Sequence, residues 1–189
     1  MSNAWRTVGR WIIVLMAAVY IMLLLRFTFF PLPAPESRGQ HTAEEIIDAV
    51  ELDPLDSIRR SLGHVNWGLG RGNRVPLRLF IFNHTGNLVL LMPLALFLRY
   101  FLPSKIGKWR IWLICGLVSV AIELTQLALS LHFGLRYRVV DLLDIIENVL
   151  GAGLILLITT IVGGLGRKIR SAYGRRHASR SALREEKDI

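Results

Sequence analysis

The sequence predicts an all-α integral membrane protein, a bundle of four transmembrane helices with a long extracytoplasmic loop that contains short amphipathic helices. Three observations predict this class. Hydrophobic residues make up 52% of the 189 residues and gather in four apolar runs, while the charged residues, 20% of the chain, lie between them. Each run has the roughly 20 residues that a helix needs to cross about 30 Å of hydrocarbon. The net charge of +9 is typical of basic flanks on the cytoplasmic ends of spans.

Other classes are excluded by the same pattern. A soluble domain would spread its apolar residues with helical or strand periodicity, and a disordered chain would carry fewer of them. No nucleic-acid-binding motif accompanies the positive charge, so no nucleic-acid partner is predicted. The single cysteine, Cys115, lies inside an apolar run. It can form no intrachain disulfide and is predicted to be buried and free.

Five segments follow one another along the chain. They are a cytoplasmic N-terminal flank at 1–10, a first transmembrane helix at 11–30, an extracytoplasmic loop at 31–78, a core with three transmembrane helices at 79–166 and a basic cytoplasmic tail at 167–189. The three core spans are predicted at 79–102, 111–131 and 142–165. The first span is interpreted as an uncleaved signal anchor, because its apolar stretch is long and no small-residue cleavage site follows it.

Orientation follows from the distribution of Lys and Arg. The 99–110 connection has four basic residues and no acid, whereas the 31–78 loop balances six arginines with seven acids. The positive-inside rule therefore places both termini in the cytoplasm. Within the loop, apolar spacing over 43–62 predicts amphipathic helices on the outer surface, interrupted at Asp53 because a residue before proline disfavours the helical region. Residues 63–73 are predicted to form a glycine-rich loop.

Polar side chains inside the spans share helix faces and one membrane level. They are Asn83 and Asn87 in the second span, Ser119, Glu123, Gln126 and Ser130 in the third, and Arg138, Asp141, Asp144, Glu147, Asn148 and Gly151 in or just before the fourth. In the third span the spacings of four, three and four place the set on one face. Asn83, Asn87, Glu123, Gln126, Ser130, Arg138, Asp141, Asp144 and Asn148 are expected in the outer half of the bundle, and Arg26 lies near the outer end of the first span. Intramembrane ionisable groups cost free energy, so such convergence indicates a functional site.

Two interpretations of these residues stay open. They could join helices through polar contacts, or they could line a water-accessible pocket that opens outward. The predicted ligand-binding or polar pocket consists of Asn83, Asn87, Glu123, Gln126, Arg138, Asp141, Asp144 and Asn148. The candidate catalytic residues are Glu123 and Asp144, because buried carboxylates can serve as general bases or bind a cation. His84 adjoins Asn83 and could contribute, but no histidine spacing matches a metal motif, and no metal or cofactor is predicted.

Three stretches resemble the VanZ-like family. They are NRVPL at 73–77, NLVLLMPL at 87–94, and an ordered pattern of ELTQ at 123–126, RVVDLLD at 138–144 and NVLG at 148–151. The resemblance covers about 70–155. Some positions depart from the family pattern, with Leu77 in place of Phe, Ala95 in place of Gly and Leu143 in place of an additional acid. The long basic tail is an extension.

The resemblance implies a multi-pass protein of the bacterial cytoplasmic membrane, and some relatives are associated with glycopeptide (teicoplanin) resistance. Membrane lipids are expected partners. The first functional hypothesis is that the outer polar pocket binds or modulates an envelope lipid, a cell-wall precursor or an amphiphilic glycopeptide head group and so contributes to teicoplanin-type resistance. Arg138, with Arg74 or Arg78, would contact an anionic head group. The alternative is an intramembrane enzyme that acts on an envelope lipid through Glu123 or Asp144. Transport is disfavoured because four helices enclose little pathway.

Overall fold

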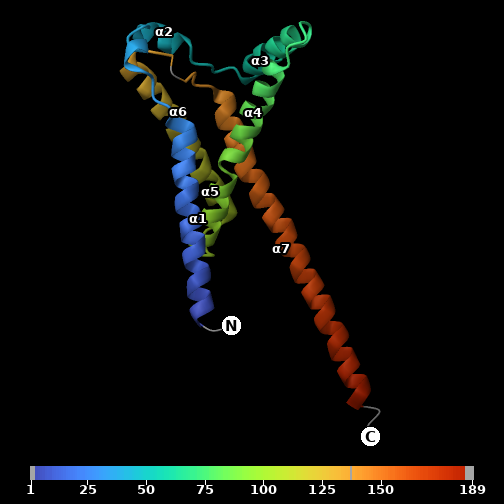
Figure 1. Ribbon diagram of the computed structural model, residues 1–189. Coiled ribbons are helices and arrows are strands. Elements are labelled where there is room, and N and C mark those ends of the chain that lie inside the picture. Colours follow the sequence, from blue (N-terminus) through green and yellow to red (C-terminus); the bar gives the residue numbers. More distant parts are fainter. Residues whose placement is uncertain (1–2, 137, 186–189) are drawn as a thin grey trace.

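The computed structural model describes residues 3–136 and 138–185, and this part of the chain is helical apart from turns and one isolated bridge (Figure 1). The helices are α1 (Asn3–Phe29), α2 (Ala43–Asp48), α3 (Pro54–Leu69), α4 (Val75–Leu90), α5 (Met92–Phe101), α6 (Lys108–Phe133) and α7 (Leu142–Glu185), with a short 3-10 turn at Pro35–Ser37. Four segments are long and apolar enough to cross a membrane: Thr7–Phe29, Val75–Phe101, Lys108–Phe133 and Leu142–Ser171. The predicted fold class is therefore confirmed.

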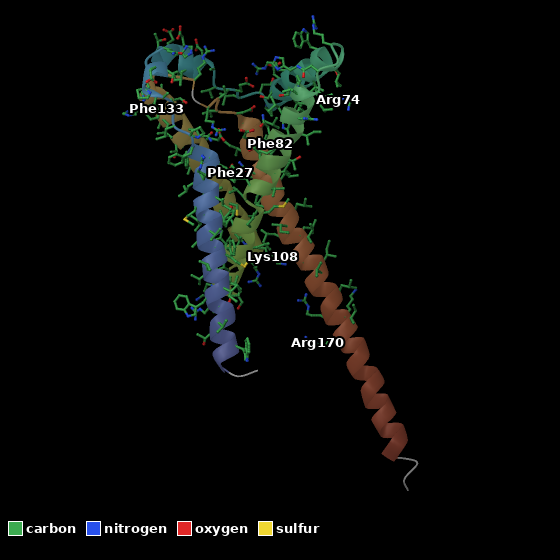
Figure 2. The ribbon with its side chains drawn as sticks, viewed as in Figure 1. Phe27, Arg74, Phe82, Lys108, Phe133 and Arg170 are labelled. Atoms are coloured by element: carbon green, nitrogen blue, oxygen red, sulfur yellow. The ribbon has the colours of Figure 1, made fainter. Side chains whose placement is uncertain are left out.

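The helices α2 and α3 cap one end of the bundle, which we call the loop end, and both chain termini lie at the other, the terminal end (Figure 1). The helix α7 packs against α4, α5 and α6, and α1 lies along α5. Large apolar side chains face outward, as expected for contact with lipid. Phe27 of α1 is 64% exposed and Phe82 of α4 is 71% exposed (Figure 2).

The second span is broken into α4 and α5. The apolar run predicts one continuous helix at 79–102, but the structure has two helices that meet at Leu91. Pro93 explains the break, since proline has no N–H to donate and its ring clashes with the carbonyl four residues earlier. Tyr20 of α1 donates its hydroxyl to the Leu90 carbonyl at 2.8 Å, next to the break. The break thus provides a contact point for α1.

The helix α3 continues through the segment predicted to be a glycine-rich loop. The interruption at Asp53 is confirmed, because this residue caps α3 by accepting the backbone N–H of Leu55 at 2.9 Å. The prediction for 63–69 was wrong, since these residues form the end of α3. Val65 is buried, and a Cβ on Gly68 would lie only 2.7 Å from the Pro76 ring. Packing against α4 offsets the roughly 1 kcal/mol that a helical glycine costs.

The loop before α2 is fastened to the end of α6. Gly134 ends α6 in the left-handed region with φ +58°. Gly39 donates its N–H to the Phe133 carbonyl at 2.8 Å, and His41 donates to the Gly134 carbonyl at 2.9 Å. A Cβ on Gly134 would lie 2.9 Å from Gly39 Cα, so the close approach requires glycine there. The 31–78 loop is therefore docked onto the bundle.

The fourth span is part of a much longer helix. It begins at Leu142 as predicted, but α7 runs to Glu185, so most of the predicted 167–189 tail continues the helix. At 1.5 Å per residue this is about twice the length of a membrane span. Residues 186–189 of the predicted tail lie outside the described residues. Cys115 is buried and free within the core, as predicted.

Candidate functional site

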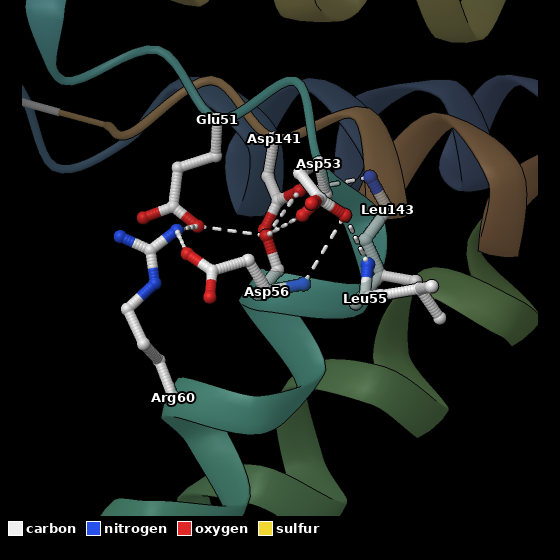
Figure 3. A network of polar contacts seen from close by, with 8 residues as sticks. Glu51, Asp53, Leu55, Asp56, Arg60, Asp141 and Leu143 are labelled. Atoms are coloured by element: carbon white, nitrogen blue, oxygen red, sulfur yellow. Dashed lines mark hydrogen bonds and ion pairs between the residues drawn. The ribbon is translucent and has the colours of Figure 1, made fainter.

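Asp141 holds the start of α7 against the loop helices (Figure 3). Its Oδ1 accepts the backbone N–H of Leu143 at 2.8 Å, which satisfies one of the first N–H groups of α7. Ser57 Oγ of α3 lies 3.1 Å from Asp141 Oδ1 and 2.7 Å from Glu51 Oε2. Glu51 and Asp141 also pair as a parallel β-bridge, and Arg60 Nη2 lies 2.7 Å from Glu51 Oε2. We call Glu51, Ser57, Arg60 and Asp141 the loop-end clamp.

Two polar pairs join α4 to α7 just below the clamp. Asn87 Nδ2 donates to Asp144 Oδ1 at 2.5 Å. His84 Nδ1 lies 2.6 Å from Glu147 Oε1, and both side chains are largely buried. The paired residues are one helical turn apart on each helix, and the two pairs cross: the earlier α4 residue, His84, contacts the later α7 residue, Glu147. The polar faces predicted for the second and fourth spans therefore meet through Asn87 and Asp144.

Glu123 brings α6 into the same region. It is only 3% exposed, and its Oε2 has no hydrogen-bond partner. Electrostatic interactions link its carboxylate with Asp144, Asp141 and Arg138. Three acidic side chains and one guanidinium from α6, α7 and the connection between them are thus close enough to influence one another.

Asn148 completes the interior on the α6 side. Its Nδ2 donates to Ser119 Oγ at 3.1 Å, while its Oδ1 is buried without a partner. Glu147 Oε2 is likewise unpaired. A buried acceptor without a donor costs about 1–3 kcal/mol, so a water, an acidic proton or a ligand donor would stabilise this region. We call the set the interior polar cluster; its members are His84, Asn87, Glu123, Asp144, Glu147 and Asn148.

Gln126 and Arg138 contact the last turn of α1. Gln126 Nε2 donates to the Thr28 carbonyl at 3.2 Å, and Arg138 Nη2 donates to the Phe27 carbonyl at 3.2 Å. The last carbonyls of a helix have no partner within it, and a cation near them interacts favourably with the helix dipole. These two predicted pocket residues therefore cap α1. The backbone N–H of Arg138 also lies 3.4 Å from Ser130 Oγ.

A small cavity of about 10 Å³, room for roughly one water molecule, lies beside Arg138 at the loop end. Two arginines and six mostly apolar residues line it: Arg136, Arg138, Ile46, Ala49, Val50, Leu127, Val139 and Val140. We call it the arginine cavity. Arg136 Nη2 donates to the Glu45 carbonyl at 3.2 Å, which fixes this side chain at the rim. Guanidinium donors beside an apolar wall suit an anionic group attached to a hydrocarbon chain.

The remaining predicted residues lie elsewhere. Asn83 is exposed on α4 and is not part of the interior polar cluster. Arg74 and Arg78 are exposed on the same helix and do not line the arginine cavity. The structure therefore divides the predicted pocket among the loop-end clamp, the interior polar cluster and the arginine cavity, which adjoin one another at the loop end.

Comparison with protein families gives one match, to the VanZ/LLP1 family, over residues 17–163. The chain belongs to the VanZ/LLP1 family. The match is wider than the resemblance over about 70–155, since it includes the second half of α1 and the whole loop. Comparison with curated proteins and with solved structures gave no significant match. All residues of the clamp, the cluster and the cavity lie inside the VanZ/LLP1 region.

Within the described part of this VanZ/LLP1 protein, no group of three or more His, Cys, Asp or Glu side chains is placed to hold a metal ion. Of the carboxylates in the interior polar cluster, Asp144 accepts a hydrogen bond from the Asn87 amide and Glu147 contacts the His84 imidazole. Their arrangement can accept hydrogen bonds and can orient Arg138 electrostatically through Glu123 and Asp144.

Two features of the site were missed from the sequence. Glu147 was placed at the edge of the polar face and His84 was given a minor part, yet they form a close pair. Equal spacings of three, from His84 to Asn87 and from Asp144 to Glu147, were the available signal. Arg136 was overlooked as well. It precedes Arg138 by two positions in a non-helical connection, where alternate side chains point to the same side.

The departures of this VanZ/LLP1 chain from the family pattern lie in packed positions. Ala95 is fully buried in the apolar core, and Leu143 is 6% exposed. An acid at position 143 would be buried, and burying a charge costs free energy unless it is paired, so leucine suits this position.

Proposed function

We propose that this VanZ/LLP1 protein lies in the bacterial cytoplasmic membrane with the terminal end in the cytoplasm and the loop end outside. The support is the distribution of charge. Both termini and the basic 99–110 connection occupy the terminal end (Figure 1), whereas the acids of the 31–78 loop gather at the loop end. Lys and Arg are retained on the cytoplasmic side of spans, so this orientation agrees with the positive-inside rule.

We infer that the loop end binds the head group of an amphiphile from the outer leaflet. The mouth of the arginine cavity carries this proposal, because the exposed side chains of Arg136 and Arg138 lie there next to a wall of aliphatic side chains. The cavity itself has room for about one water molecule, so the head group would bind outside it. Arginine donates two parallel hydrogen bonds to phosphate or carboxylate. An anionic head group would lie against the guanidinium groups, and the hydrocarbon chain would remain in the bilayer.

The interior polar cluster supports the cavity electrostatically. Glu123 and Asp144 both interact with Arg138 from the interior side. Opposite charges in a poorly hydrated region attract more strongly than in water, so this pair helps to keep the guanidinium at the cavity. Removing either carboxylate should therefore weaken ligand binding without direct contact with the ligand.

The chemical class of the ligand is an anionic amphiphile such as an envelope lipid, a lipid-linked cell-wall precursor or an amphiphilic glycopeptide. The VanZ family is linked to teicoplanin resistance. Binding any of these ligands at the outer surface would alter how such an antibiotic meets its target. A contribution to teicoplanin-type resistance is therefore part of the proposal.

The direct test uses the purified full chain in lipid nanodiscs with dodecyl phosphate as the probe. Arg136→Gln should weaken binding about 10- to 100-fold, because a hydrogen bond to a charged group contributes about 1.5–3 kcal/mol. Arg78→Gln removes the same charge from an exposed position outside the cavity and should change little. Equal binding of dodecyl phosphate and dodecanol, or equal losses in both variants, would contradict the proposal.

A cellular test compares a deletion strain complemented with wild type, Asp144→Asn or Arg136→Gln. Teicoplanin susceptibility and the envelope lipid profile are measured together. We expect both variants to shift susceptibility toward that of the deletion strain while the lipid profile stays constant. A lipid species that accumulates in the Asp144→Asn strain would instead favour the enzymatic alternative.

A further inference from the structure

A second hollow lies at the terminal end, between the start of α6 and the middle of α7. Its volume is about 360 Å³, within the range of small-ligand sites. The residues that line it are Lys108, Trp109, Trp112, Gly153, Leu156, Leu157 and Thr160. The arginine cavity shares none of them. We call this hollow the α6–α7 groove.

The floor of the groove is built around Trp112. Its indole Nε1 donates to the Val149 carbonyl of α7 at 3.0 Å, which fixes the ring across the interface. The ring lies over Gly153, where a Cβ would come within 3.2 Å of Nε1. Any larger residue at position 153 would push the ring outward. The groove is therefore a consequence of a glycine that faces an anchored tryptophan.

Charge is confined to one end of the groove. Lys108, labelled in Figure 2, begins α6. Its Nζ donates a hydrogen bond to Thr160 Oγ1, so its ammonium group bridges to α7. Along α7 from Thr160 to Gly153 the lining is apolar, with Leu157 exposed and Leu156 buried. Seven residues of helix correspond to about 10 Å. A cation at the mouth and an apolar track of this length match a phosphate and the upper part of an acyl chain.

The surroundings favour an anionic partner. The 99–110 connection next to the groove has four basic residues and no acid. Arg110 lies with its Cζ 5.4 Å from the centre of the Trp109 ring at the rim. Tryptophan, lysine and arginine are the residues that anchor proteins at the membrane–water interface. The groove therefore lies at the level of lipid head groups.

We propose that the α6–α7 groove is a binding site for one anionic phospholipid of the leaflet on the terminal side. Its phosphate contacts Lys108, and one acyl chain lies over Gly153 and Leu157 against Trp112. The site is independent of the arginine cavity, because it lies at the opposite end of the bundle. The orientation proposed above makes this leaflet the cytoplasmic one.

The test uses tryptophan fluorescence of the full chain with Trp5, Trp11 and Trp67 each replaced by Phe, so that only Trp109 and Trp112 report. The protein is reconstituted in phosphatidylcholine with increasing fractions of phosphatidylglycerol that carries bromine on its acyl chains. Bromine quenches only tryptophans that it touches. We expect quenching to saturate at a lower fraction of brominated phosphatidylglycerol than of brominated phosphatidylcholine.

Two lysines of the same connection provide a matched pair of variants. Lys108→Gln should weaken the preference for phosphatidylglycerol about fivefold, as expected for one lysine acting on an anionic lipid. Lys105→Gln removes an equal charge outside the groove and should leave the preference for phosphatidylglycerol unchanged. Lys108→Arg keeps the positive charge in the groove and should show the wild-type preference. The helical circular dichroism of each variant shows whether the fold is intact.

Three results would overturn the proposal. Equal quenching by both brominated lipids would show that no anionic site exists. Equal losses in Lys108→Gln and Lys105→Gln would show that general surface charge, and no particular site, attracts the lipid. Full displacement by inorganic phosphate would show a site for a free anion that makes no use of the apolar track.

Discussion

Gly151 is the residue at which α7 comes closest to α4. A Cβ built there would lie 1.7 Å from the Leu88 carbonyl oxygen, a backbone atom that cannot rotate away. Leu88 and Gly151 are separated by the same 63 residues as His84 and Glu147, so α4 and α7 run in the same direction with a fixed register. The glycine therefore sets the distance at which the polar pairs of this interface form.

Gly151→Ala should push α4 and α7 apart and destabilise the protein. Inserting a methyl group into a packed interface costs about 1–3 kcal/mol, and a clash with backbone lies at the upper end of this range. Thermal unfolding in detergent, followed by circular dichroism, should give a lower Tm. Gly164→Ala on the same helix has no heavy atom within 4 Å of the added Cβ and serves as the control. An unchanged Tm in Gly151→Ala would contradict the register described above.

At the scale of elements, α3 is joined to α7 by the loop-end clamp. Ser57 is central to it, because it is 4% exposed and its hydroxyl lies between the Glu51 and Asp141 carboxylates. Arg60 neutralises part of the charge from the solvent side. The start of α7 is thus fixed both by its own cap and by a side chain from the loop.

Ser57→Ala should loosen α3 while leaving the spans in place. The loss of the hydroxyl leaves two partly buried carboxylates without their shared donor, at a cost of about 1–3 kcal/mol. Hydrogen exchange of the α3 amides should therefore accelerate, whereas exchange within α6 should stay unchanged. Ser104→Ala, at an exposed position of the 99–110 connection, is the matched control. Equal acceleration in α3 and α6 would indicate global unfolding and would contradict a local role.

The helix α2 carries a pH-dependent cap. The backbone N–H of Thr42 and then the His41 side chain hold the pKa of Glu45 below its ordinary value of 4.5. A lowered carboxyl pKa stabilises the folded state fully above pH 4.5, and this stabilisation is lost as the pH falls through the folded pKa. His41→Ala should raise the titration midpoint of Glu45, measured by carboxyl NMR shifts. A midpoint that does not move would show that the imidazole contributes nothing.

At the scale of the whole molecule, the proposed orientation can be measured by thiol accessibility. In a Cys115→Ala background, Asn66→Cys places a thiol on exposed α3 and Ser104→Cys places one at the terminal end. An impermeant thiol reagent added to intact cells should label position 66 and leave position 104 unlabelled. Permeabilised cells should show labelling at both positions. The reverse pattern in intact cells would invert the proposed topology.

The sequence predicted the helices and their polar faces well, because both depend on periodicity within one segment. Ser119, Glu123, Gln126 and Ser130 were expected on one face, and all four are buried. The partners could not be predicted, because they depend on how helices are set against each other. The pairing of His84 with Glu147 requires the close approach of α4 and α7 at Gly151. The break at Leu91 depends on Pro93. The extension of α3 depends on its packing against Pro76.

The attachment of α1 to the bundle has a consequence for its sequence. Gln126 and Arg138 donate hydrogen bonds to the backbone carbonyls of Thr28 and Phe27 in α1. Every amino acid has such a carbonyl. Among the α1 side chains, Tyr20 makes a specific contact, whereas most of the others face outward. The bundle therefore requires a helix of suitable length and polarity at this place more than a particular amino-acid sequence. An apolar helix from another protein could therefore replace α1 if it kept a tyrosine at position 20. Such a replacement is a practical starting point for chimeric proteins.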